Sequence, residues 1–408
     1  MQPLAIELDY RGVGALLDRL VAARTLPGAS VLVLRDGREA YYHEAGMQDL
    51  AAGAPIRRDT IFRIYSMTKP VTAAAVMVLV DEGKLKLDDP VSKYVPEFAD
   101  LRVYAGRHGD VIETAAARPI KIRDLLTHTA GFSYWFQANS PVAELYADKV
   151  GAGRFEPWRF DPAYGGLDGL AKSLSQVPLV SQPGERWHYS MALEVAGIVI
   201  ERASGQRLDR FMKTRLFDPL GMHDTGFSVD PANAKRLASL YEPNPEGGLQ
   251  LVESGATSLL LKPVPGLSGG GGLTSTIDDY AHFAQMLLNG GELGGHRVLS
   301  RKAVREMMTN HLVPSQLAEL PQLAAFGLGG SGDGLGFGLG GAVALTPPAN
   351  GVPVYPGEYS WGGAASTTFW VDPSNRLVVV FMTQLIPLSA EMLRDKLHAA
   401  IYQAPPTP

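Results

Sequence analysis

Apolar residues recur along the chain in two spacings, one typical of helices and one typical of strands. Residues 10–24 are apolar at intervals of three and four, and residues 66–83 are apolar on nearly every face, so an amphipathic helix and a buried helix are expected. Further helices are predicted at 122–126, 167–175, 192–203, 208–216, 278–288, 300–309 and 389–400. Strands are predicted at 29–34, 39–45, 337–345, 352–360, 367–371 and 376–384.

The predicted strands lie at both ends of the chain, and most of the predicted helices lie between them. The first two strands flank the turn Arg35-Asp36-Gly37 and form a hairpin, and residues 242–262 are compatible with another. Because antiparallel strands pair easily, we expect both ends to complete one sheet. The prediction is an α+β fold: residues 1–80 and 242–408 form a domain with a central antiparallel sheet flanked by helices, and residues 81–241 form an inserted, mainly helical domain. The glycine-rich residues 327–341 are predicted to be a mobile loop leading into a strand.

Composition narrows the class of protein. With 408 residues, 46% apolar and 19% charged, the chain is typical of globular proteins. The net charge of -5 gives no reason to expect nucleic acid, and the absence of cysteine excludes disulfides and thiolate chemistry. The nine histidines show no metal-ligand spacing, so no metal or cofactor is expected, and His128 is predicted to be a hydrogen-bonded turn residue. No apolar run reaches the ~18 residues of a membrane span, and the first residues do not resemble a signal peptide. A cytoplasmic protein without a membrane partner is expected, and the oligomeric state is left open.

The buried helix carries a reactive pair at its start. Ser66 is expected at the positive end of the helix dipole, and Lys69 shares its face three residues later. Burial should lower the pKa of Lys69, and a neutral amine beside a serine can activate it as a nucleophile. The alternative is that Ser66 only caps the helix while Lys69 extends its amine into solvent. Because a Ser-x-x-Lys spacing arises by chance about once or twice in 400 residues, the rest of the chain must decide.

A second motif competes for the role of nucleophile. Gly266–Gly270 places Ser268 in a G-x-S-x-G pattern, which requires a strand before it and a helix after it. Two prolines precede the motif and two more glycines follow it, which disfavours both elements. The downstream residues that could complete a catalytic triad are Asp333 or Asp372 with His398, and His398 lies in the predicted terminal helix, which disfavours this role. Ser268 is therefore predicted not to be the nucleophile, and the glycines are predicted to allow a close backbone approach.

Two later segments supply what a Ser-Lys pair lacks. Tyr189 follows a Gln-Pro-Gly turn and precedes a helix, so its phenol can point into a cleft. With a pKa lowered by Lys69, this phenol could take the proton of Ser66 and return it to a leaving group. Gly362 and Gly363 would let a backbone N–H approach an acyl oxygen and complete an oxyanion hole with the N–H of Ser66.

These segments together resemble a known family. Ser66-Met67-Thr68-Lys69, Tyr189-Ser190-Met191 and Trp361-Gly362-Gly363 are similar to the three motifs of the family VIII carboxylesterases, serine esterases with the class C β-lactamase fold. The resemblance extends over residues 16–402 and includes LLTHTAGF and QPGERWHYS. It implies that the site lies between the two predicted domains, that Ser66 is the nucleophile with Lys69 and Tyr189 as the base system, and that the backbone N–H groups of Ser66 and Ala364 form the oxyanion hole. The residues expected to bind substrate are Trp361, Gly362, Gly363, Met191 and Tyr134.

Two departures from the β-lactamase motifs indicate the substrate. Met191 stands where the Tyr-x-Asn motif has its asparagine, and Trp361 stands where the Lys-Thr-Gly motif has its lysine. An amide and a cation suited to the side chain and carboxylate of a β-lactam are thereby missing. We expect small neutral esters, with a short acyl chain or an aryl group, as substrates. The alternatives are a β-lactamase or peptidase, an acyltransferase, and a relative that binds acyl groups without turnover.

Overall fold

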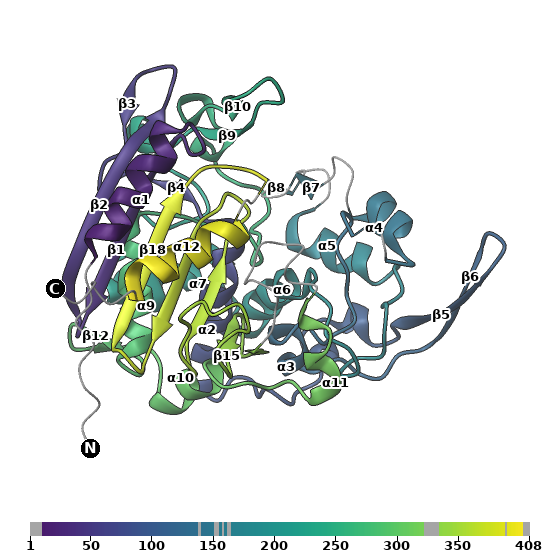
Figure 1. Cartoon of the computed structure of the whole chain (residues 1–408). Helices are drawn as coiled ribbons and strands as arrows, with labels where there is room; N and C mark the ends of the chain where they lie inside the picture. Colours follow the sequence, from purple (N-terminus) through teal and green to yellow (C-terminus); the bar gives the residue numbers. More distant parts are fainter. Residues whose placement is uncertain are drawn as a thin grey trace.

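A computed structural model describes residues 10–137, 140–150, 155–156, 159–160, 165–321, 334–387 and 390–402. Its main sheet has eight antiparallel strands in the order β14-β15-β16-β17-β18-β1-β2-β3 (Figure 1). The strands are β1 Gly28–Arg35, β2 Arg38–Asp49, β3 Ala54–Pro55, β14 Leu335–Phe337, β15 Ala342–Ala344, β16 Tyr359–Gly362, β17 Thr368–Asp372 and β18 Leu377–Thr383. Strands from both ends of the chain therefore complete one sheet, and the predicted α+β fold is confirmed.

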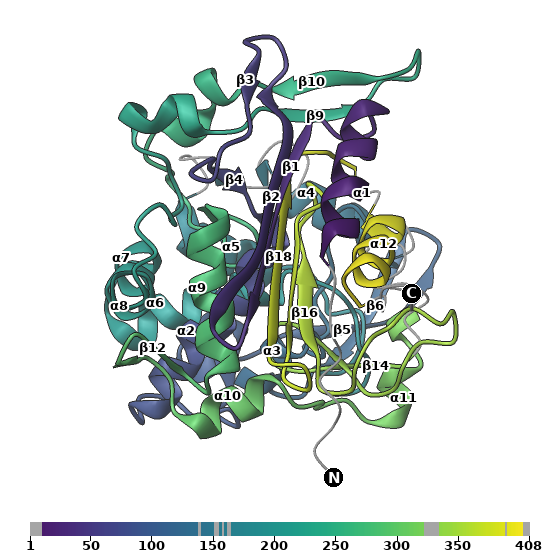
Figure 2. The same ribbon diagram turned by 60° about the vertical axis from the view of Figure 1, so that its left-hand side comes forward.

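The sheet is buried on both faces, which explains why its central strands are almost wholly apolar. In β1, Val31 and Val33 face one layer and Leu32 faces the other. Helices α1 (Arg11–Ala22) and α12 (Ala390–Tyr402) cover the first face, and α9 (Ile277–Leu288) lies on the opposite one (Figure 2). The core thus extends through the sheet into the helical layer behind it.

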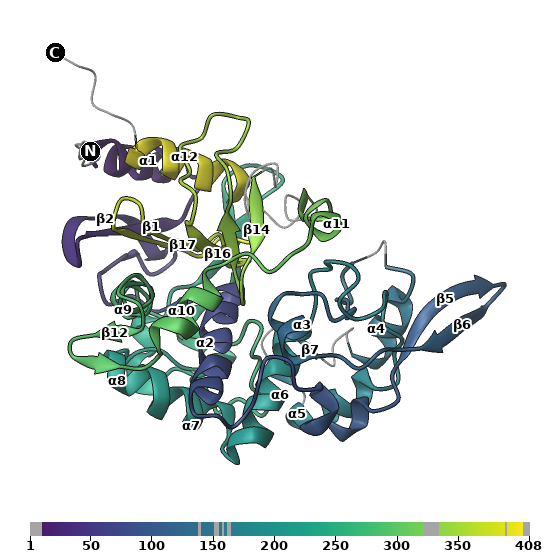
Figure 3. The same cartoon turned by 90° about the horizontal axis from the view of Figure 1, so that it is seen from below.

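Helix α2 (Thr68–Asp81) connects that layer to the remaining helices. It packs against α6 (Ala192–Ser204), and α3 to α6 lie on the side of α2 opposite to α9 (Figure 3). The helices not yet given are α3 Ile122–Leu126, α4 Ala143–Lys149, α5 Gly166–Leu174, α7 Leu208–Met212, α8 Asp218–Leu220, α10 Arg301–Met307 and α11 Pro314–Leu317. The division into domains at residues 81 and 241 stays a prediction.

Two strand predictions need correction, and one pair of strands was missed. The predicted strand 337–345 is instead the hairpin β14–β15, because Gly340 takes a φ of 80° and turns the chain. The predicted strand 352–360 forms only from Tyr359, since prolines at 353 and 356 cannot donate ladder hydrogen bonds. The ribbon of β5 (Arg102–His108) and β6 (Val111–Ala116), which extends away from the helices in Figure 3, was not predicted.

Other predictions agree with the structure or lie outside it. The possible hairpin at 242–262 corresponds to β9 (Leu240–Pro243) and β10 (Leu249–Glu253). Residues 327–333 of the glycine-rich stretch and residue 389, the predicted start of the last helix, lie outside the described residues. Within the described ranges, no helix combines the length and apolar character needed to cross a membrane.

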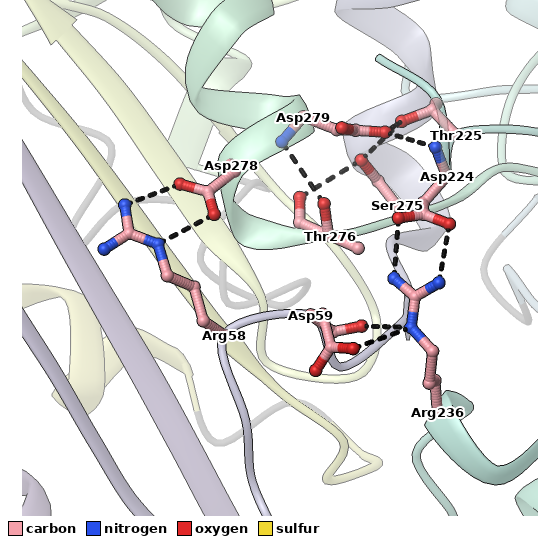
Figure 4. Close-up of polar contacts among 9 residues, drawn as sticks. All are labelled: Arg58, Asp59, Asp224, Thr225, Arg236, Ser275, Thr276, Asp278 and Asp279. Atoms are coloured by element: carbon pink, nitrogen blue, oxygen red, sulfur yellow. Dashed lines mark hydrogen bonds and ion pairs between the residues drawn. The ribbon is translucent and has the colours of Figure 1, made fainter. Parts of the chain in front are cut away.

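Ion pairs fix the start of α9 and the segment that leads toward Ser66 (Figure 4). Arg58 donates to both carboxylate oxygens of Asp278 at 2.8 Å. Arg236 donates to Asp224 at 2.9 and 2.6 Å and pairs with Asp59 at 3.1 Å. These bidentate contacts hold residues 58–59 in place before the short strand β4 (Phe62–Arg63), which pairs with β11 (Thr274–Ser275).

Candidate active site

Ser66 lies in a short 3₁₀ turn, Tyr65–Met67, that runs directly into α2. The α-helix proper therefore begins two residues later than expected, and Lys69 occupies its first turn. Tyr65 has a φ of 45°, a region that residues other than glycine rarely adopt. Such backbone strain is common where a fold holds a functional side chain, and here it immediately precedes Ser66.

Three predicted residues meet at the hydroxyl of Ser66. Lys69 Nζ donates to Ser66 Oγ at 3.0 Å and to the carbonyl oxygen of Gly270 at 2.7 Å. Tyr189, in the loop before α6, donates its phenolic O–H to the same Oγ at 2.8 Å. Lys69 is only 1% exposed, so the alternative in which its amine extends into solvent is wrong.

Burial changes the proton affinities of both partners. It lowers the pKa of Lys69 from 10.5 to about 7, as expected, against the opposing charge of Glu194. It raises the pKa of Tyr189 above 10.0, an effect that the hydrogen bond with Ser66 opposes only in part. The expectation of a lowered phenol pKa is therefore wrong. At neutral pH, Lys69 is the better proton acceptor and Tyr189 is a proton donor.

The turn after β16 approaches Ser66 from the sheet. A side chain at Gly363 would come within 2.3 Å of the carbonyl oxygen of Ile64, so only glycine fits this approach. The turn is held by the N–H of Gly363, which donates to Thr367 at 2.8 Å. The predicted role of the N–H groups of Ser66 and Ala364 as an oxyanion hole stays a prediction.

The predicted substrate-binding residues surround Tyr189 at different depths. The ring centroid of Tyr134 lies 5.4 Å from that of Tyr189, and that of Trp361 lies 5.7 Å from it. Both residues are buried, and Gly362 ends β16 beside Trp361. Met191 is fully buried at the start of α6, where its N–H donates to Ser133 at 3.3 Å. The substrate contacts of these residues stay predictions.

Two polar residues near the site were not predicted from the sequence. Gln137 donates to the carbonyl oxygen of Tyr189 at 2.9 Å and so holds the loop that carries the phenol. Glu194, on α6, is 2% exposed and exerts the charge that opposes the lowered pKa of Lys69. Glu194 could have been identified from the sequence, because it is the single charged residue in the apolar run 192–200 and charged residues are rarely buried without a partner.

Ser268 occupies a different environment from Ser66. It is 1% exposed, lies in a loop with no strand before it and no helix after it, and donates its hydroxyl to Glu194 at 2.8 Å. Asp372 and His398 contact α12 or lie on it, and residue 333 is outside the described residues. The predicted lack of a strand-turn-helix context is confirmed. His128 is fully buried, with its ring centroid 4.8 Å from that of Tyr189.

The chain is similar in sequence and in fold to several known proteins. The beta-lactamase family matches residues 13–403. An uncharacterized protein of Mycobacterium tuberculosis is 37% identical over 385 residues, covering 93% of this chain and 91% of that protein. Esterase EstB of Burkholderia gladioli is 33% identical over 429 residues, covering 98% of each chain. The solved structure of EstCE1, a hydrolase with promiscuous acyltransferase activity, covers 96% of this chain and 98% of its own, with a TM-score of 0.80 and 26% identity.

Proposed function

The chain belongs to the beta-lactamase family, and we propose that it is a serine carboxylesterase that hydrolyses small neutral esters through an acyl-enzyme on Ser66. The proposal rests chiefly on the two hydrogen bonds that Lys69 and Tyr189 donate to Ser66 Oγ, at 3.0 and 2.8 Å. The esterase EstB and the hydrolase EstCE1 support ester hydrolysis as the reaction.

In the proposed mechanism, neutral Lys69 takes the proton of Ser66 as Oγ attacks the ester carbonyl carbon. The carbonyl oxygen becomes an oxyanion that the N–H groups of Ser66 and Ala364 stabilise. As the carbon–oxygen bond to the alcohol breaks, Tyr189 protonates the leaving oxygen and recovers a proton from Lys69. Water then attacks the acyl carbon by the same route, releases the acid and restores the Ser66 hydroxyl.

The proposed substrate class follows from Met191 and Trp361. A lysine at the position of Trp361 would offer a carboxylate a charge-assisted hydrogen bond of roughly 1.5–3 kcal/mol. The indole instead favours the apolar surface of an alkyl or aryl ester. Met191 likewise lacks the amide that would hold an acylamide group. Both residues therefore favour uncharged esters over β-lactams.

The nucleophile can be identified directly. We expect a phosphonate ester to modify Ser66, as read by intact mass and peptide mapping. Ser66→Ala should abolish ester hydrolysis, whereas Ser268→Ala should keep most of it, because Ser268 donates its hydroxyl to Glu194 and the hydrogen bonds of Lys69 and Tyr189 go to Ser66. An inactive Ser268→Ala beside a fully active Ser66→Ala would refute the proposal.

The substrate class has its own test. Each missing polar contact is expected to cost about tenfold in rate, since ~1.4 kcal/mol corresponds to a factor of ten. We expect kcat/KM for p-nitrophenyl butyrate to exceed that for a chromogenic cephalosporin by at least about a hundredfold. Trp361→Lys should narrow that ratio, with Ser66→Ala as the blank for both substrates. Comparable efficiencies would contradict the substrate class but leave the mechanism in place.

Acyl transfer is the second candidate, because EstCE1 is described as having promiscuous acyltransferase activity. An alcohol would replace water in the second step. Adding a primary alcohol during ester cleavage distinguishes the two reactions: hydrolysis yields the acid alone, whereas transfer yields a new ester in proportion to the alcohol.

A further inference from the structure

Glu194 is an unusual residue for its position. The first nine residues of α6, Ala192 to Ile200, are all buried, and Glu194 is the only one that can carry a charge. A carboxylate in such surroundings is costly unless polar groups compensate it. Its Oε2 is buried without a hydrogen-bond partner among the described residues, and its neighbours on α2 include Lys69. The polar groups that offset the cost of burying this carboxyl come from the loop that contains Ser268, Gly269 and Gly270.

The G-x-S-x-G segment provides that compensation. Ser268 donates its hydroxyl to Glu194 Oε1 at 2.8 Å. Burial raises the pKa of Glu194, while Ser268, the charge of Lys69 and the N–H groups of Gly270 and Gly269 all oppose that rise. Every one of these neighbours favours the ionised carboxylate. The motif that imitates a nucleophile elbow therefore surrounds a buried carboxyl with polar groups that favour its ionised form.

The other side of the same loop holds α2. The carbonyl oxygen of Gly270 accepts from Lys69 Nζ at 2.7 Å, and that of Gly269 accepts from Thr72 Oγ1 at 2.6 Å. A Cβ on Gly270 would lie 2.5 Å from Glu194 Oε1, and a Cβ on Gly269 would lie 2.6 Å from the carbonyl oxygen of Leu193. The loop is thus clamped between α6 and α2, with Glu194 on one side and Lys69 on the other.

Other titratable groups around Lys69 are uncharged near neutral pH. Its Nζ lies 4.8 Å from the ring centroid of Tyr189 and 5.7 Å from that of Tyr134. The pKa of each phenol is raised by burial, and burial holds the pKa of His128 well below 6.5. Glu194 is the one group whose charge opposes the lowered pKa of Lys69 in the described part of the chain.

We propose that Glu194 is a positioning residue for Lys69: bound by Ser268, it fixes the Gly269–Gly270 turn and places a carboxylate on the opposite side of Gly270 from the Lys69 amine. The inference rests on the proposed function, in which Lys69 is the base. Glu194 itself touches neither substrate nor Ser66. Its role is to keep the amine aligned and basic enough to accept the Ser66 proton.

The test compares pH profiles of Glu194→Gln and wild type. The amide keeps an oxygen that can accept from Ser268 but removes the charge, so the pKa of Lys69 should fall further. We expect the acidic limb of kcat/KM, and of the rate of Ser66 phosphonylation, to move to lower pH by about one unit, because a nearby opposite charge typically shifts a pKa by about one to three units. Glu194→Asp keeps the charge, so its acidic limb should lie close to that of wild type.

Glu358 offers a matched control. It is 1% exposed, accepts from Arg394 at 2.9 Å and lies next to His398 beneath α12. Glu358→Gln should lower the Tm without moving the acidic limb. A folded Glu194→Gln whose limb coincides with that of wild type would overturn the proposal. Should Glu194→Gln fail to fold, Ser268→Ala decides in its place: a limb shifted to lower pH supports the proposal, and an unmoved limb overturns it.

Failure of the proposed function would look different. If phosphonate does not modify Ser66 in the wild type and no ester is hydrolysed, the function itself is wrong. If Ser66 is modified in every variant with one common pH dependence, the function stands and only the role of Glu194 falls.

Discussion

Lysine side chains are normally protonated at neutral pH, whereas a substantial fraction of Lys69 is neutral there. Burial brings the pKa of Lys69 to about 7, and only the neutral amine can accept the proton of Ser66. The neutral fraction rises with pH through 7, so activity should rise with it. We expect kcat/KM for p-nitrophenyl butyrate to fall about tenfold for each unit below that midpoint and to level off above it.

Lys69→Arg is the control for this profile. A guanidinium stays protonated throughout the accessible pH range, so this variant should be nearly inactive at every pH. A wild-type profile that is flat from pH 5 to 9 would show that the amine is not the base.

Tyr189 gives the second prediction at this scale. Tyr189→Phe removes the O–H that lies 2.8 Å from Ser66 Oγ but keeps the ring and its packing. We expect kcat to fall by ~10²–10⁴, the usual contribution of an acid-base group, with little change in KM. Steady-state kinetics measure kcat and KM for this variant, and Tyr134→Phe, which also replaces a buried tyrosine beside Lys69, is the variant for comparison. A loss below about threefold would assign proton transfer to Lys69 alone.

Sequence reasoning worked best for residues that a motif places. Ser66, Lys69 and Tyr189 were predicted as one group, and the structure brings their side chains together. The direction of the Tyr189 pKa was wrong, because the sequence does not reveal that the phenol is wholly buried. Glu194 was missed for a related reason: its partners come from the Gly269–Gly270 loop, some seventy residues away, as the Ser268–Glu194 separation of 74 shows.

At the scale of elements, the turn after β16 has room for glycine alone at position 363. Gly363→Ala would place a Cβ 2.3 Å from both the Ile64 carbonyl oxygen and Thr367 Oγ1, so the turn must shift. The N–H of Ala364 would move with it. We expect kcat to fall by about 10²-fold or more, as for loss of an oxyanion donor.

Gly12→Ala is the matched substitution, since the atom nearest to its new Cβ is 3.8 Å away in α12. It should keep full activity and an equal or higher Tm, because alanine favours a helix. Equal activity of the two variants would mean that the turn does not shape the site.

Most helices and the longest strands could be predicted from periodicity, whereas the helices α4 and α11 and the short strands could not. Residues 28–35 and 377–383 are long, apolar runs, and they pair in register with Val31 opposite Phe381. The strands β14 and β15 have three residues each, too few to show a period. The ribbon β5–β6 is mostly exposed on both faces, so no buried stripe marked it.

At the scale of the whole molecule, the site joins segments that are distant in the chain. Ser66 precedes α2, Tyr189 precedes α6, and Trp361 lies on β16 of the sheet. Their convergence puts a titratable amine inside the largest apolar cluster, which includes residues of α2, α6 and the sheet. Folding must therefore offset the cost of desolvating Lys69.

That cost predicts a pH-dependent stability. Between pH 7 and 10.5, Lys69 is protonated in the unfolded chain and largely neutral in the folded one, so the unfolded state binds more protons and wild-type stability rises with pH. Lys69→Met lacks this term, which amounts to about 1.4 kcal/mol per pH unit at most. The Tm difference, Lys69→Met minus wild type, should therefore decrease steadily from pH 7 to pH 9.

The Tm difference between Lys69→Met and wild type should decrease with pH regardless of which protein has the higher Tm at pH 7. Losing the hydrogen bonds to Ser66 and Gly270 lowers the Tm of Lys69→Met, whereas losing the desolvation cost of the amine raises it. Without the amine, Glu194 should hold its proton to higher pH, and ionising it then destabilises the variant, which adds to the same trend. Lys172→Met, at an exposed site on α5, should give a Tm difference that does not change with pH. Paired melting curves at pH 6, 7, 8 and 9 measure both differences, and parallel curves for Lys69→Met and wild type would mean that the buried amine keeps its ordinary pKa.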